Sequence, residues 1–158
     1  MDKTKLAKID LEAFPGYQIR RMQQIAVAIF LQETGPFGIT PVQYAALHTV
    51  NNTPGIDQRT LARTIGFDTS TIAGVIDRLE SRALMLRSVS PQDRRARLLT
   101  LTAEGRALLD DIVPSILRIQ DRILNALPKR ERAEFMRMLG VLVTANNELS
   151  RAPTDNAS

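Results

Sequence analysis

Apolar side chains recur at helical spacing along most of the chain, and a strand-like pattern appears only once. The helical spacing predicts helices over residues 17–32, 41–50, 103–126 and 129–149. In the first of these the apolar positions extend beyond a single stripe, so that helix must be covered on most sides, which a partner chain could do. The centre of the chain, residues 57–102, is predicted to hold two shorter helices followed by two strands.

Capping residues and helix breakers mark the ends of these elements. Thr40 can cap the helix that starts at Pro41, and Gln43 can complete a capping box. The run GPFG at residues 35–38 breaks the helix before it. Pro114 is expected to kink the long helix that contains it, because proline removes one backbone donor.

The central segment has the pattern of a helix, a tight turn, a second helix and a hairpin. Gly66 ends the first helix, and Asp68 or Thr69 starts the second. One face of the second helix is an apolar stripe, formed by Ile72, Val75, Ile76 and Leu79. The opposite face is small and polar, and carries Ser70, Thr71, Gly74, Asp77 and Arg78. Such a face fits the major groove of DNA.

Two strands, residues 84–89 and 97–101, flank an arginine-rich loop, so the segment is predicted to be a helix-turn-helix with a β-wing. The whole chain is only mildly basic, with 21 Lys and Arg against 17 Asp and Glu. Residues 57–97 nevertheless hold eight arginines, five acidic residues and no lysine. Arginine suits bidentate contact with phosphates and guanine edges. A solvated charged surface is the alternative, but the arginines lie on the wing and the polar helix face, which favours nucleic acid.

The composition excludes several other classes. The length of 158 residues fits one domain. The absence of cysteine excludes disulfides and fits a cytoplasmic protein. No signal peptide and no run of ~20 apolar residues is present, so no membrane partner is expected. The sequence has one histidine, no nucleophile elbow and no residues at metal-ligand spacing. We therefore expect that the protein is not an enzyme and that it has no catalytic residue, metal or cofactor. The polar N-terminus, residues 1–12, is expected to be frayed or only loosely helical, and the tail, residues 150–158, is expected to be disordered.

The runs LARTIGFDTSTIAGVIDRLESRALMLR and SPQDRRARLLTLTAEGRALL resemble the MarR family of winged-helix regulators. The wing pair Asp93 and Arg95, placed just before LLTLT and TAEG, makes the resemblance specific. Two positions depart from the pattern, since many relatives have glycine at Ala83 and aspartate at Ser90. Ala83 can be accommodated if the helix end needs no left-handed residue, whereas Ser90 makes the wing less acidic. GYQIRRMQQIAVAIF and TPVQYAALHTV resemble the regulators of nicotinic acid breakdown within that family.

The resemblance implies a mainly α (α+β) fold and one MarR-type domain over residues 1–158. Residues 13–35 and 103–150 would be dimerisation helices, and residues 40–102 the winged helix-turn-helix. A symmetric homodimer would place two recognition helices about one DNA turn apart, on an inverted-repeat operator in double-stranded DNA.

The resemblance also implies roles for individual residues in DNA binding. Residues that would enter the major groove are Thr69, Ser70, Thr71, Gly74 and Arg78. Arg95 would reach the minor groove, with Asp93 bracing the loop. Arg94 and Arg97 would contact phosphate or other wing residues, and Gln58 and Arg59 would hold phosphate.

Members of the family bind aromatic carboxylates between the first helices and the DNA-binding part. Tyr44 and His48 lie on one helix face, and the candidate ligand residues are Tyr17, Arg20, Gln24, Tyr44 and His48. A satisfied or surface histidine is the alternative for His48. We therefore expect a ligand-responsive transcriptional regulator, a repressor rather than an activator, released by a small aromatic acid effector such as a metabolite of the nicotinic acid pathway. The alternative is a dimeric winged-helix protein-interaction module without DNA binding.

Overall fold

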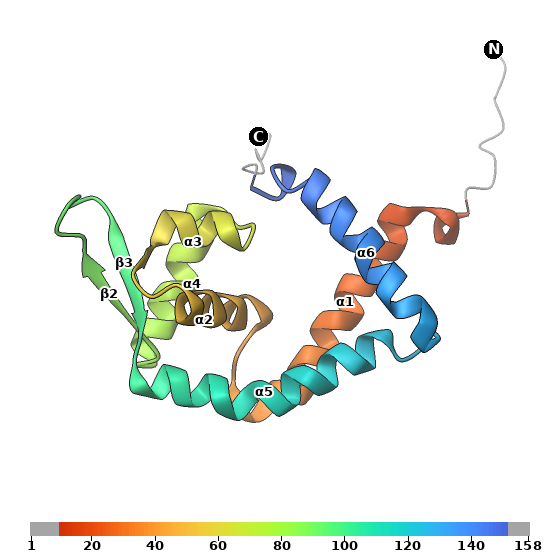
Figure 1. The fold of residues 1–158 in the computed structure, drawn as a ribbon, viewed down its shortest axis with the longest axis horizontal. Coiled ribbons are helices and arrows are strands. Elements are labelled where there is room, and N and C mark those ends of the chain that lie inside the picture. Colours follow the sequence, from red (N-terminus) through yellow and green to blue (C-terminus); the bar gives the residue numbers. More distant parts are fainter. Residues whose placement is uncertain (1–9, 152–158) are drawn as a thin grey trace, which may run out of the picture.

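The structure, a computed structural model, describes residues 10–151 and arranges them as two lobes joined by a long helix (Figure 1). In chain order the described elements are η1 (Leu11–Ala13), α1 (Pro15–Thr34), η2 (Gly35–Phe37), α2 (Pro41–Asn52), β1 (Ile56–Asp57), α3 (Gln58–Thr64), α4 (Thr69–Ser81), β2 (Met85–Val89), β3 (Arg97–Leu101), α5 (Ala103–Leu124), α6 (Lys129–Ala145) and η3 (Leu149–Arg151). The predictions for residues 1–9 and 152–158 lie outside the described residues. Residues 10–12, predicted to be frayed or only loosely helical, cap and begin the short helix η1. The helix η3 occupies the start of the tail that was predicted to be disordered.

The expected start of α2 is confirmed. The Thr40 hydroxyl accepts a hydrogen bond from the backbone N–H of Gln43 at 3.3 Å, and the Gln43 amide oxygen accepts one from the N–H of Thr40 at 3.1 Å. This is the reciprocal capping box. The long helix α5 runs through Pro114 without a break, and Figure 1 shows it bowed along its length.

A three-stranded antiparallel sheet forms the wing and closes one side of the core. The strand order is β1-β3-β2, with Met85 opposite Leu101 and Val89 opposite Arg97. The two-residue strand β1 was not predicted, because a pair of residues is too short to show an alternating pattern. Ile56 of β1 pairs with Leu99 of β3, so the sheet reaches back to the start of α3.

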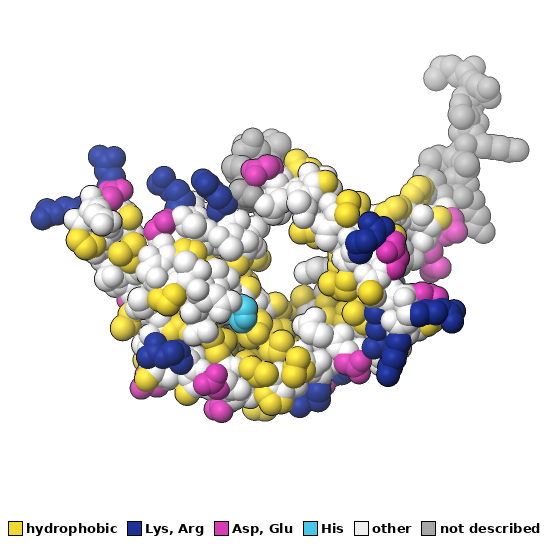
Figure 2. All heavy atoms as spheres, in the orientation of Figure 1, with side chains coloured by type: hydrophobic (Ala, Val, Ile, Leu, Met, Phe, Trp, Pro, Cys, Tyr) yellow, Lys and Arg dark blue, Asp and Glu magenta, His cyan; other side chains and the backbone are white. Residues whose placement is uncertain are grey.

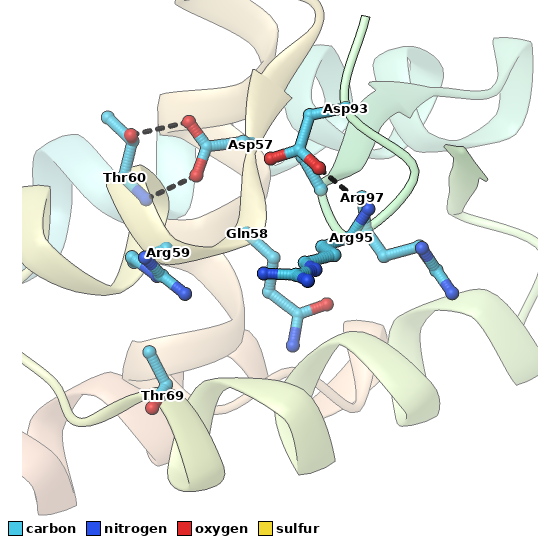
Figure 3. Close-up of a pocket in the computed structure, with 9 residues that line it drawn as sticks. Asp57, Gln58, Arg59, Thr60, Thr69, Asp93, Arg95 and Arg97 are labelled. Carbon is cyan, nitrogen blue, oxygen red and sulfur yellow. Dashed lines mark hydrogen bonds between the residues drawn. The ribbon is translucent and has the colours of Figure 1, made fainter. Parts of the chain in front are cut away.

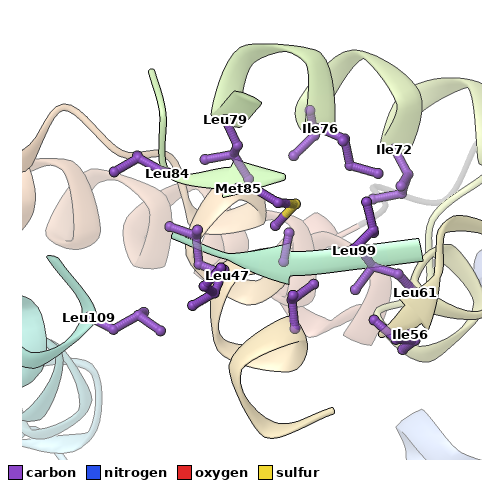
Figure 4. Close-up of a cluster of buried hydrophobic side chains, with 14 of the residues drawn as sticks. Leu47, Ile56, Leu61, Ile72, Ile76, Leu79, Leu84, Met85, Leu99 and Leu109 are labelled. Atoms are coloured by element: carbon purple, nitrogen blue, oxygen red, sulfur yellow. The ribbon is translucent and has the colours of Figure 1, made fainter. Parts of the chain in front are cut away.

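The core lies inside the winged helix-turn-helix lobe (Figure 4). The predicted stripe of α4 is fully inside it, since Ile72, Val75, Ile76 and Leu79 are all buried. Leu47 of α2, Leu61 of α3, Met85 of β2 and Leu99 of β3 meet this stripe and have no exposed surface. Leu109 and Ile112 bring the first half of α5 into the same cluster, which fixes α5 to the lobe.

The turn from α4 into β2 corrects one expectation. Ala83 has φ 56°, so the helix end does require a left-handed residue, although alanine occupies the position. Thr102 secures this turn, because its hydroxyl donates to the Ala83 carbonyl at 2.7 Å and accepts from the N–H of Gly105 at 2.9 Å. The expected cap of α5 at Thr102 is thus confirmed, and it also joins the ends of α4 and α5.

The second lobe contains α1, the far half of α5, and α6. α1 packs against α5, and Glu33 of α1 forms ion pairs with Arg118 at 2.9 Å and Arg122 at 2.8 Å. No described residue of α6 is buried. Among the described residues no single helix is long and apolar enough to cross a membrane. The segment α1–η2 together with α2 reaches the required length and apolar composition, but the two are bent by 69°, and core helices of soluble proteins reach it as well.

Candidate nucleic-acid interface

The helix-turn-helix is built on two aspartate caps. Asp57 accepts hydrogen bonds from the N–H of Thr60 at 2.9 Å and from its hydroxyl at 2.5 Å, and these bonds lower the pKa of the carboxyl. Asp68 accepts from the N–H and hydroxyl of Thr71, both at 2.7 Å, and from the Ser70 hydroxyl at 2.8 Å. These bonds, led by the Thr71 N–H, lower the pKa of Asp68 to about 2. Both helix starts are therefore fixed, with Gly66 at φ 73° in the turn between them.

The wing loop, residues 90–96, is held by its own side chains. The buried Ser90 hydroxyl accepts from the N–H groups of Gln92 and Asp93 at 3.2 and 3.3 Å, so serine supports the loop despite the missing charge. Asp93 accepts from the N–H of Arg95 at 2.9 Å, which braces the tip. Arg97 donates to the Arg94 carbonyl at 2.9 Å and is thereby a partner within the wing.

An open cleft of about 620 Å³ lies between α3, the start of α4 and the wing (Figure 3). Residues that line it are Asp57, Gln58, Arg59, Thr60, Thr69, Asp93, Arg95, Ala96 and Arg97. Six of these are predicted DNA-contact residues, so the fold brings together positions up to 39 residues apart, from Gln58 to Arg97. The other predicted contacts lie outside the cleft lining: Ser70, Thr71, Gly74, Arg78 and Arg94.

Besides Arg97, two of the eight central arginines have a structural role. Arg82 donates to the carbonyls of Phe37 and Gly38 at 2.9 and 2.7 Å, which ties the end of α4 to the link between α1 and α2. Arg87 of β2 pairs with Asp77 at 2.5 Å and Glu80 at 2.8 Å on α4. Sequence reasoning missed both roles, because the partners are distant in the chain or are backbone atoms.

Arg87 also donates to the Gln58 amide oxygen at 3.5 Å, so the wing base, α4 and α3 form one unit. Five central arginines are exposed and have no side-chain partner within the described part of the chain: Arg59, Arg63, Arg78, Arg94 and Arg95. Figure 2 shows Lys and Arg side chains gathered over the wing tip and α3.

The predicted ligand residues fall into two groups. On α1 the Arg20 guanidinium lies over the Tyr17 ring, 5.2 Å from its centroid, and Gln24 is exposed. On α2 the rings of Tyr44 and His48 are 5.8 Å apart. Within residues 10–151 no hydrogen bond or ring contact joins the two groups.

The α2 group, Tyr44 and His48, has an aromatic neighbour on α1 that the sequence reasoning missed. Phe30 of α1 lies 6.2 Å from Tyr44 between ring centroids, so the first two helices share an aromatic contact. Burial raises the pKa of the Tyr44 hydroxyl. The His48 ring is exposed and lies 3.4 Å from the Asn52 amide. The described residues contain no cluster of three or more His, Cys, Asp or Glu that could hold a metal.

Comparison with known proteins gives consistent matches. The sequence model of the MarR family matches residues 39–96. The HTH-type transcriptional repressor NicR of Pseudomonas putida is 29% identical over 83% of each chain. The putative transcriptional regulatory protein for the hcr operon of Thauera aromatica is 34% identical over 84% of this chain and 81% of its own. These relatives are described as transcriptional regulators.

Solved structures share the fold over most of their length. The repressor CouR of Rhodococcus jostii, bound to a 23-mer DNA duplex, is 32% identical with a TM-score of 0.79, over 84% of this chain and 94% of its own. Bordetella bronchiseptica BpsR, whose DNA binding is regulated by 6-hydroxynicotinic acid, is 30% identical with a TM-score of 0.80, over 85% and 96% of the two chains.

Proposed function

The chain belongs to the MarR family of transcriptional regulators, and we propose that it is a homodimeric repressor. In this proposal the dimer binds an inverted-repeat operator, and a small aromatic acid releases it from the DNA. The observation that carries the proposal is the cleft between α3, α4 and the wing. Its lining holds Arg59, Arg95 and Arg97 together with hydrogen-bonding side chains. A surface of this shape and composition suits the phosphate backbone at the edge of a groove.

In this proposal the exposed face of α4 enters the major groove, with Thr69, Ser70, Thr71, Gly74 and Arg78 toward the bases. The wing lies alongside, where the side chains of Arg94 and Arg95 have no partner among the described residues and can enter the minor groove or contact phosphate. Asp93 shapes the loop, and Arg97 fixes it. Gln58 is held by Arg87 while its amide N–H₂ remains available, and Arg59 extends toward phosphate.

Dimerisation is supported by the unpartnered apolar surface of the second lobe. Large apolar side chains that are exposed there are Leu11, Phe14, Ile19, Ile25, Leu31, Val113, Leu117, Met136, Met138, Leu139, Val141, Leu142, Val143 and Leu149. Figure 2 shows hydrophobic side chains along α6. A monomer in water seldom exposes so many, and a symmetric partner would cover them while setting the distance between two α4 helices.

The effector proposal rests on the aromatic and cationic groups of α1 and α2. An aromatic acid could stack near Tyr44 and His48 and place its carboxylate on Arg20, with Tyr17 and Gln24 beside it. That the relative BpsR responds to 6-hydroxynicotinic acid supports this class of ligand. A ligand bound between α1 and α2 would favour one relative orientation of the winged helix-turn-helix lobes of the two subunits over the orientation that binds DNA.

The DNA-binding part is tested by gel shift with DNA that flanks the protein's own gene. We expect binding that weakens with salt. Arg95→Ala should weaken it roughly tenfold and reduce the salt dependence, whereas Arg130→Ala, an exposed arginine on α6, should not. If the wild type binds no duplex even at low salt, the protein is better described as an interaction module.

The effector part is tested separately by thermal shift with pyridine and benzene carboxylates, followed by calorimetry of the best binder. Arg20→Ala and His48→Ala should each weaken its affinity. Unchanged affinity in both variants would remove these residues from the ligand site.

A further inference from the structure

The two hydroxyl groups at the start of α4 both donate to one carboxylate. Ser70 Oγ donates to Asp68 Oδ1 at 2.8 Å, and Thr71 Oγ1 donates to Asp68 Oδ2 at 2.7 Å. Oδ1 also accepts the backbone N–H of Thr71 at 2.7 Å. Ser70 and Thr71 are both exposed.

The direction of these bonds is unambiguous. The pKa of Asp68 is lowered to about 2, so the group is ionised at neutral pH and can only accept hydrogen bonds. Each hydroxyl carries a single proton, and both protons are already committed to the carboxylate. Toward a ligand, Ser70 and Thr71 therefore offer lone pairs and no donor.

This polarity has a consequence for base recognition. In the major groove the only donors on the bases are the amino groups of adenine and cytosine, whereas guanine and thymine present acceptor oxygens. The N-terminal residues of a recognition helix are the ones that contact base edges. An acceptor-only pair of hydroxyls at this position thus selects amino groups.

We propose that Asp68 is a positioning residue that fixes Ser70 and Thr71 as hydrogen-bond acceptors, so that α4 recognises exocyclic amino groups of adenine or cytosine and not the keto oxygens of guanine or thymine. This inference rests on the proposed function, because it takes α4 as the helix that enters the major groove. It adds the chemical group that these two side chains contact.

The first experiment finds the contacted bases. The wild-type protein selects duplexes from a library with a randomised 20-base-pair centre, and the selection is repeated with Ser70→Ala and Thr71→Val. The positions at which each variant relaxes the base preference are the contacts of that side chain. Failure of the wild type to enrich any duplex would overturn the proposed function itself.

The second experiment alters single groups at those positions in the selected duplex. Purine in place of adenine, or 2-pyrimidinone in place of cytosine, removes the amino group. The matched arm replaces the keto oxygen of the paired base by sulfur, a much weaker hydrogen-bond acceptor, with 4-thiothymine for thymine or 6-thioguanine for guanine. These analogues keep the ring N–H of the base, so both arms act on the same single Watson–Crick hydrogen bond.

We expect amino deletion to weaken wild-type binding roughly tenfold more than keto replacement. At the Thr71 contact this difference should vanish in Thr71→Val, and at the Ser70 contact in Ser70→Ala. If keto replacement is the more damaging arm, or if the two arms are equal in the wild type, the inference is wrong while DNA binding stands.

The third experiment reverses one hydroxyl. In Asp68→Asn the amide oxygen can keep the bonds that Oδ1 makes, and the amide N–H₂ would donate to Thr71 Oγ1 and free its proton. Asparagine caps helices as well as aspartate does, so the fold is retained. The amino preference should be lost at the Thr71 contact and kept at the Ser70 contact.

The chain supplies a matched control in the cap of α3, where Thr60 donates to Asp57 in the same manner. Asp57→Asn makes the same chemical change one helix away. Whatever it does to overall affinity, it should leave the amino preference at both contacts unchanged. An unchanged preference at the Thr71 contact in Asp68→Asn, or the same loss in Asp57→Asn, would contradict a role for Asp68 in base recognition.

Discussion

Among the described residues, Ala83 is the one residue other than glycine that has a positive φ. Its φ of 56° lies in the left-handed region, which costs an alanine about 1–2 kcal/mol. The Thr102 hydroxyl holds its carbonyl at 2.7 Å and helps to keep the turn closed. The turn is thus maintained at the expense of stability.

Ala83→Gly should raise the free energy of unfolding by about 0.5–1 kcal/mol, because glycine relieves the strain and loses only part of the gain to chain entropy. Urea unfolding followed by circular dichroism measures it. The same substitution at Ala107, an exposed position inside α5, should instead destabilise by about 1 kcal/mol. A loss of stability in Ala83→Gly would show that the strain is negligible.

Gly74 lies inside α4, and a methyl group added there would meet nothing within 4 Å. Packing among the described residues therefore does not explain this glycine, and close approach to DNA is the role that we propose for it. Gly74→Ala should raise the free energy of unfolding by about 1 kcal/mol and weaken operator binding. Denaturation and gel shift of the same sample measure both effects. A variant that is stabilised and binds as well as the wild type would remove Gly74 from the interface.

Single residues also show where prediction from sequence stops. Thr40, Gly66 and Asp68 were identified correctly because each acts on neighbours within three or four residues. Arg82 and Arg87 were counted with the DNA-facing arginines, but their partners are carbonyls 44 and 45 residues away and acids on α4. Charge and spacing in the sequence are the same for an arginine that faces DNA and for one that holds a turn.

At the scale of elements, Glu33 is the main ionic link between α1 and α5. Its hydrogen bonds to Arg118, and then to Arg122, lower the pKa of the carboxyl below its usual 4.5. A depressed carboxyl pKa stabilises the fold at pH values above the unfolded-state pKa, and this contribution is lost as the pH falls through the folded-state value.

Glu33→Gln should therefore lower the unfolding temperature at pH 7, and its difference from the wild type should shrink as the pH falls below about 4.5. Thermal melts from pH 3 to pH 7 provide the measurement. Glu134→Gln is the control, since Glu134 pairs with Arg137 within one exposed helix and should have little effect at pH 7. A constant difference across the range would mean that the charge of Glu33 is not what stabilises the pair.

The element boundaries were predictable to within a few residues where apolar periodicity and caps coincide. The stripe of α4 was identified residue by residue, because burial on one helix face leaves a clear period. The strand β1 was not predicted, because its two residues pair with β3 some 43 positions later, Ile56 with Leu99. Long-range strand pairing leaves no local sequence signal.

At the scale of the whole molecule, the exposed apolar surface of α1, α5 and α6 is where we propose that a second copy binds. Leu142→Asp places a charge on α6 at a side chain that is 56% exposed in the single chain. We expect this variant to sediment as a monomer, to keep its helical circular dichroism, and to lose most of its operator affinity, because both half-sites must be held together. Arg130→Ala should remain a dimer. A Leu142→Asp variant that stays dimeric would show that the dimer interface lies elsewhere.

The candidate site was predictable in part at this scale. The resemblance placed Gln58, Arg59, Thr69 and Arg95 on one DNA-binding surface, and the fold gathers all four around one cleft. The proposed ligand residues on α1 and α2 remain a prediction, because the structure holds them as two separate groups. A site between helices depends on how the helices are oriented, and composition carries no such information.

The hydrogen bond from Thr102 to Ala83 joins the start of α5 to the turn that leads into the wing, so the wing moves together with α5. The helix has 22 residues, roughly 33 Å at 1.5 Å per residue, so a tilt of about 5° at its far end would swing the wing by about 3 Å. That displacement is comparable to a hydrogen-bond length, so in the proposed complex it would move the wing arginines away from the duplex. Ligand binding near α1 could in this way control whether both grooves are bound at once.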